Sequence, residues 1–72
     1  MELPQGYSDS AIAEILKLAH KGVEEVYGAF ETPSSVEREI FEKCKGAARE
    51  YNPQMAYEVA KSEMTSFLSR GF

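Results

Sequence analysis

His20 and Cys44 are the only imidazole and the only thiol in the chain, and together they could form a base and a nucleophile. Cys44 falls on an apolar helical stripe, where a cysteine behaves as a small hydrophobic residue. His20 falls at the edge of another stripe, where an amphipathic side chain keeps its polar tip in water. We therefore predict that Cys44 is buried and unreactive and that the chain is not an enzyme.

Carboxylates gather in two places, at Glu24 with Glu25 and along Glu37, Glu39 and Glu42. No combination of His, Cys and carboxylate has the spacing of a metal site such as C-x-x-C or H-x-x-x-H. A glycine-rich phosphate loop is also absent from the sequence. The sequence thus predicts neither a metal nor a cofactor, and we expect these carboxylates on solvated helix faces.

The length and the charge of the chain narrow its class. Its 72 residues suffice for one small domain, residues 1–72, and its net charge is −4. Binding to nucleic acid or to an anionic membrane requires clustered Lys and Arg, so neither partner is expected. A single cysteine allows no internal disulfide. No apolar run approaches the roughly 20 residues of a membrane span, and residues 1–9 do not resemble a secretory signal. We expect an intracellular protein with a protein or peptide partner.

The first helix is expected near residues 10–30, after a loose arm over residues 1–7. Ser8, Asp9 and Ser10 are candidate caps for its first backbone N–H groups. Its apolar side chains recur with the helical period, at Ile12, Ile15, Leu16, Ala19, Val23, Val26, Tyr27 and Phe30. A break at Gly22 is the alternative, but the unbroken stripe favours one continuous helix.

The second helix is expected near residues 34–50. Thr32, followed by Pro33 at the first helical position, is one candidate cap, and a capping box from Ser34 to Glu37 is another. The box would explain why the charged Glu37 falls on the apolar face. That face carries Val36, Ile40, Phe41, Cys44, Ala47, Ala48 and Tyr51.

The third helix is expected near residues 53–69, because Asn52 is a good cap and Pro53 suits a first helical position. Its main stripe consists of Ala56, Tyr57, Ala60, Met64, Phe67 and Leu68. Met55 and Val59 lie off this stripe. Three amphipathic helices with short connections must cover one another, so the expected fold is all-α, a three-helix bundle.

Residues 34–45, followed by Glu50 and Tyr51, resemble the middle of a KIX domain. KIX domains are three-helix coactivator modules of CREB-binding protein and of the Mediator tail subunit. The similar features are a polar cap, the aliphatic–aromatic pair Ile40 and Phe41, and a Glu-Tyr pair that opens the third helix; the matching tyrosine is Tyr51 or Tyr57. The same helix also resembles the central three-helix domain of the transcription elongation factor S-II.

The KIX resemblance implies a transcription-coactivator role, a nuclear location, and an amphipathic activation-domain helix as the ligand, bound between the first and third helices. The positions of the groove residues come from the helical wheel and not from the family. Met55 and Val59 stand one turn apart and suit the floor of such a groove. The predicted partner-binding residues are Leu16, Ala19, Val23, Tyr27, Met55, Tyr57, Val59 and Met64.

The alternative function is self-association. A small bacterial or viral homodimer would bury the same surplus apolar surface in a two-fold interface and would have no ligand groove. Without the KIX relationship, the expected location is the cytoplasm.

Overall fold

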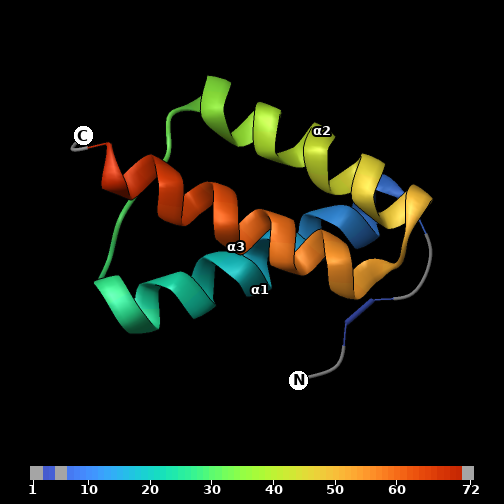
Figure 1. Ribbon diagram of the computed structural model, residues 1–72, viewed down its shortest axis with the longest axis horizontal. Helices are drawn as coiled ribbons and strands as arrows, with labels where there is room; N and C mark the ends of the chain where they lie inside the picture. The colour runs from blue at the N-terminus through green and yellow to red at the C-terminus, as the bar shows by residue number, and fades with distance from the viewer. Residues whose placement is uncertain (1–2, 5–6, 71–72) are drawn as a thin grey trace.

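The computed structural model describes residues 3–4 and 7–70, and its regular structure consists of the helices α1 (Asp9–Tyr27), α2 (Ser34–Glu50) and α3 (Pro53–Ser69). No strand occurs among the described residues. Each helix runs roughly opposite to the one before it (Figure 1). The predicted all-α three-helix bundle is confirmed. Residues 1–2 and 5–6 of the expected loose arm lie outside the described residues, while Leu3 packs against the core.

Helix α1 begins as predicted but ends earlier. The Ser8 hydroxyl caps it by accepting a hydrogen bond from the backbone N–H of Ala11 at 3.2 Å. The helix continues through Gly22 and ends at Tyr27. Its C-cap is Gly28, whose φ of 88° lies in the region that favours glycine. Phe30, which the apolar stripe placed inside the helix, therefore belongs to the following loop.

The bounds of α2 and α3 agree with the prediction, but one cap differs. Pro33 is the N-cap of α2, with an extended backbone at ψ 154°, and no side chain caps the helix. The proposed caps from Thr32 and from Ser34 to Glu37 are thus corrected, because helix α2 already begins at Ser34. Asn52 caps α3 as expected, since its Oδ1 accepts from the backbone N–H of Met55 at 2.8 Å.

The core lies where α3 packs against both other helices. Ala56 and Ala60 of α3 are fully buried, and their small side chains allow a close approach. The Cys44 thiol of α2 donates to the Ala56 carbonyl oxygen at 3.4 Å. Helices α1 and α2 contact each other much less than either contacts α3. Helix α3 therefore holds the other two helices together, and the space between α1 and α2 contains the fewest helix–helix contacts.

Gly22 marks a close contact between α1 and α3. A Cβ atom built at Gly22 would lie 3.2 Å from the hydroxyl oxygen of Tyr57, which is a tight distance. The Tyr57 ring is buried, and the ammonium of Lys61 lies 5.1 Å from its centroid. The glycine in the middle of a helix thus makes room for the end of an aromatic side chain.

We expect Gly22→Ala to change the stability little in the natural chain and to stabilise it by about 0.5–1 kcal/mol in a Tyr57→Phe background. Alanine improves helix propensity by up to about 1 kcal/mol, but the new methyl group must displace the Tyr57 hydroxyl. Urea unfolding followed by circular dichroism of the four chains measures both effects. An equal effect of Gly22→Ala in the two backgrounds would show that the hydroxyl does not constrain this position.

Candidate functional site: a groove between α1 and α2

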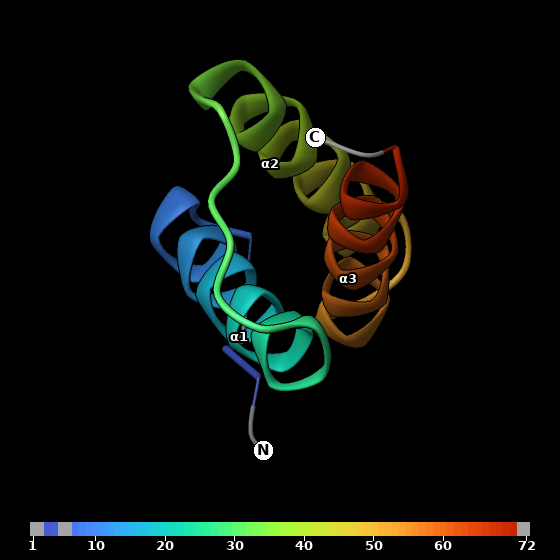
Figure 2. The same ribbon diagram turned by 90° about the vertical axis from the view of Figure 1, so that its left-hand side faces the viewer.

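An open hollow of about 1450 Å³ lies between α1 and α2, and we call it the α1–α2 groove. Residues 28–33 cross one end of the space between the two helices (Figure 2). Beyond the other end, Lys45 Nζ of α2 lies 3.2 Å from Asp9 Oδ1 of α1. The apolar lining consists of Ala13, Leu16, Ala29, Phe30, Ile40, Phe41 and Met64. All three helices and the connecting loop therefore contribute to it.

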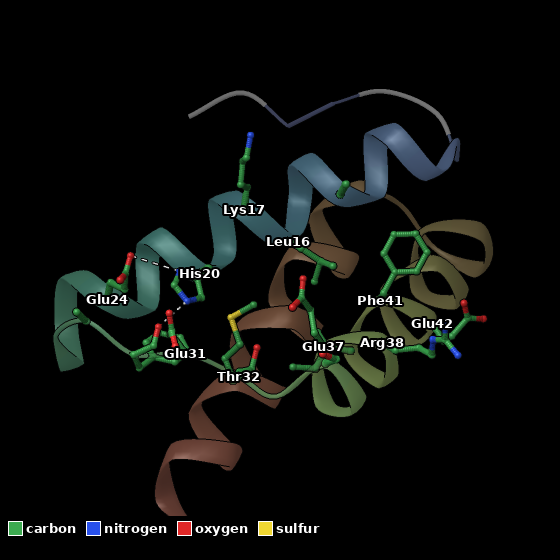
Figure 3. A pocket seen from close by; sticks show the side chains of 16 residues that line it. Leu16, Lys17, His20, Glu24, Glu31, Thr32, Glu37, Arg38, Phe41 and Glu42 are labelled. Atoms are coloured by element: carbon green, nitrogen blue, oxygen red, sulfur yellow. Dashed lines mark hydrogen bonds and ion pairs between the residues drawn. The ribbon is translucent and has the colours of Figure 1, made fainter. Parts of the chain in front are cut away.

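The floor of the groove is continuous with the hydrophobic core. Ile40 and Met64 are 3% and 5% exposed, so they face the groove only from below. Leu16 of α1 and Phe41 of α2 are half-buried and line it from opposite sides (Figure 3). Phe41 lies on the predicted apolar stripe, yet it faces a partly open space and not the closed centre of the bundle.

The charged residues around the groove are mostly acidic. The carboxylates come from Glu24, Glu31, Glu37 and Glu42, and the cations from Lys17 and Arg38. Lys17 Nζ contacts Glu14 Oε1 at 3.6 Å, whereas Glu31, Glu37 and Glu42 form no ion pair within the described residues. The side chain of Glu37 points into the hollow near Leu16 (Figure 3). An apolar floor beside unpaired carboxylates suits an apolar surface flanked by cations.

His20 holds the loop against α1. Its Nε2 lies 3.1 Å from the carbonyl oxygen of Phe30, and its Nδ1 lies 3.3 Å from Glu24 Oε1 (Figure 3). Because a carbonyl oxygen only accepts, Nε2 carries the hydrogen in the first contact. The imidazole ring of His20 also stacks on the phenyl ring of Phe30, with 4.2 Å between the two centroids. These contacts position Phe30 at one end of the groove.

His20 and Cys44 do not form a nucleophile–base pair in this structure. The Cys44 side chain is fully buried, and its thiol donates to the backbone of α3. Burial, with a smaller effect from the charge of Glu63, raises the pKa of Cys44 to about 11. Both nitrogens of His20 are engaged by Phe30 and Glu24. The predicted burial of Cys44 is confirmed.

The eight predicted partner-binding residues are dispersed in the structure. Leu16 and Met64 line the α1–α2 groove. Ala19, Val23 and Tyr57 are 0%, 3% and 7% exposed and belong to the core. Their burial leaves them almost no surface for a partner, which corrects their assignment as groove walls.

The other three predicted residues lie outside the lining of the α1–α2 groove. Tyr27 and Met55 are exposed, while Val59 is half-buried and packs against the core. Packing within the bundle therefore accounts in part for the apolar side chain at Val59, and no partner is needed to cover it.

Helical periodicity does not identify Phe30, Phe41 and Glu37 as groove residues, although the sequence contains one signal. A glutamate on the apolar stripe of the second helix was explained by a capping box. The capping box is absent from the structure. A glutamate is tolerated on the apolar stripe at position 37 because this part of the stripe faces the open hollow.

Three further findings concern possible metal binding, membrane spans and relatives of the chain. Among the described residues, no three of His, Cys, Asp and Glu are placed to hold a metal ion. None of the helices there has the combined length and apolar character needed to cross a membrane. Comparison with models of protein families, with curated proteins and with solved structures finds no match.

Proposed function

We propose that this chain is a non-catalytic interaction module whose α1–α2 groove binds a basic amphipathic helix of a partner protein. The observation that carries the proposal is an apolar floor left uncovered between two helices and flanked by unpaired carboxylates. Leu16, Phe41 and Met64 would contact the apolar face of the ligand, and Glu31 and Glu37 would face its cations.

The size of the groove supports a peptide segment as the ligand. Pockets for small molecules have volumes of roughly 300–1,000 Å³, and this hollow of about 1450 Å³ exceeds that range. A helical segment about 10 Å in diameter belongs to this larger class of ligand. Laid between α1 and α2, such a helix would complete a four-helix arrangement.

The charge of the chain favours a basic partner over a second copy. Each copy carries a net charge of −4, so self-association would bring two acidic surfaces together. A cationic helix would instead be attracted by Glu24, Glu31, Glu37 and Glu42. Homodimer formation is the outcome to be tested against this proposal.

The KIX resemblance of residues 34–51 supports a finer proposal, in which the partner helix is part of a transcription activation domain and the chain acts as a nuclear coactivator. In that family the ligand lies between the first and third helices, whereas we propose the first and second. The cytoplasm is the proposed location if the partner has no role in transcription.

Titration with a designed peptide tests the proposal. The chain contains no tryptophan, so one Trp on the apolar face of a 14-residue Leu/Lys peptide would report binding by its fluorescence. We expect saturable binding that weakens with salt and a shift of backbone amide resonances along the groove. A scrambled peptide of the same composition is the control. Absence of binding, resonance shifts confined to the Met55 side of α3, or a dimer in light scattering would contradict the proposal.

Phe41→Ala is expected to weaken binding of this peptide about 30-fold, because an aromatic side chain at the centre of a groove is a typical hot spot. Tyr51→Ala is the matched control, since Tyr51 is 65% exposed and lies outside the groove lining. The amide spectrum of each variant establishes that it is folded before the titration. Equal affinities of the two variants would remove Phe41 from the binding surface.

A further inference from the structure

We infer that the partner helix enters the α1–α2 groove with its N-terminal end against the loop of residues 28–33, so that it runs parallel to α2 and antiparallel to α1. This inference rests on the function proposed above and adds the orientation and charge pattern of the ligand. The inference follows from the uneven distribution of charge along the groove. We call the end lined by residues 29–32 the loop end, and the end lined by Ala13 and Phe41 the far end.

The loop end of the groove is acidic. Glu24 lies in the last turn of α1, Glu31 in the loop, and Glu37 in the first turn of α2. Glu24 contacts His20, but Glu31 and Glu37 form no ion pair within the described residues. These two carboxylates are thus available to a ligand at the end where α1 stops and α2 starts.

The far end carries charges of both signs. The Arg38 side chain points away from the loop, toward Glu42 (Figure 3). Lys17 lies between Leu16 and His20, midway along the groove, and its side chain points away from the hollow (Figure 3). Its ammonium contacts Glu14, so its charge is already partly balanced. Neither positive nor negative charge dominates the far end. A cationic segment is therefore attracted less strongly there than at the loop end.

An α-helix has a dipole along its axis, and this dipole matches the charge distribution along the groove in only one of the two possible orientations. The N-terminus of an α-helix carries a partial positive charge and unsatisfied backbone N–H groups, which carboxylates stabilise. Glu31 and Glu37 lie where these groups would be if the N-terminal end met the loop. Lys or Arg residues in the N-terminal half of the partner would add to the same attraction. The expected ligand is therefore a helix whose cations are concentrated in its first two turns.

Two peptides of identical composition test the orientation. Both have the apolar positions of the Leu/Lys peptide and its single Trp, but one has Lys in its N-terminal half and Gln in its C-terminal half, and the other has them exchanged. We expect the first peptide to bind about tenfold more tightly, in line with two surface charge interactions, at Glu31 and Glu37. Glu31→Gln with Glu37→Gln should largely remove the difference, whereas Glu50→Gln with Glu58→Gln, on exposed residues outside the groove lining, should not.

A nitroxide attached in advance to one end of the peptide shows the orientation directly. With the label at the N-terminal end, we expect the amide signals of residues 28–34 to broaden; with the label at the C-terminal end, those of residues 13–17 and 41–45. A reversed pattern, or equal broadening of both regions by both labels, would overturn the inference while binding in the groove still stands. If neither peptide binds in the groove, the proposed function fails and the inference fails with it.

Discussion

Replacing Ile15 by alanine is expected to destabilise the chain by about 2–5 kcal/mol. The Ile15 side chain is fully buried at the centre of the bundle, and its truncation removes buried methyl and methylene groups and leaves a cavity. At about 0.05–0.15 kcal/mol per residue, a domain of 72 residues has a total stability of roughly 4–11 kcal/mol. This one substitution therefore removes a large part of the stability.

The loss is measured by urea unfolding at 25 °C, followed by circular dichroism at the helical minimum. Val26→Ala is the matched control, because Val26 lies on the same helix and is 74% exposed. We expect the control to change the free energy of unfolding by less than about 0.5 kcal/mol. If Ile15→Ala were no more destabilising than Val26→Ala, the placement of Ile15 in the core would be wrong.

Cys44 in the folded chain is expected to react with thiol reagents at least about 100-fold more slowly than in the unfolded chain. Only the thiolate reacts, and a rise of the pKa from 9.0 to about 11 lowers the thiolate fraction near pH 8 by about 100-fold. Burial of the side chain also blocks the reagent, so the reaction requires opening of the bundle. Labelling rates in buffer and in concentrated urea measure the ratio.

Ile15→Ala should accelerate the labelling of Cys44 in buffer, because it raises the population of the opened state. Val26→Ala should leave the labelling rate nearly unchanged. Rapid labelling of the folded natural chain would show that the thiol is accessible and would contradict its burial.

The same pKa shift makes stability depend on pH in a defined range. The folded chain holds the Cys44 proton more tightly than the unfolded chain, so this contribution is fully present below about pH 9 and is lost as the pH rises toward about 11. Cys44→Ala removes this part of the pH dependence. Identical pH profiles of the natural chain and the variant would mean that the thiol titrates alike in both states.

The sequence by itself determined the three helices and most of the residues that they bury. Helix boundaries depend on a few neighbouring residues: the hydroxyl of Ser8 and the amide of Asn52 act within three residues of themselves, and Pro53 tolerates only a first helical position. The burial of Ile15 and Cys44 follows from the spacing of apolar residues along one helix. These are local or periodic properties, and they need no knowledge of how the helices are arranged.

The tertiary structure decided where the apolar surface stays open. A helical wheel assigns Leu16, Ala19 and Val23 to one face of α1, but it does not say which of them α3 covers. That depends on the close contacts of Ala56 and Ala60 with the other helices, on the room that Gly22 leaves for Tyr57, and on the early end of α1 before Gly28. Because side-chain volumes must match between residues far apart in the chain, α3 closes against both neighbours and the hollow remains between α1 and α2.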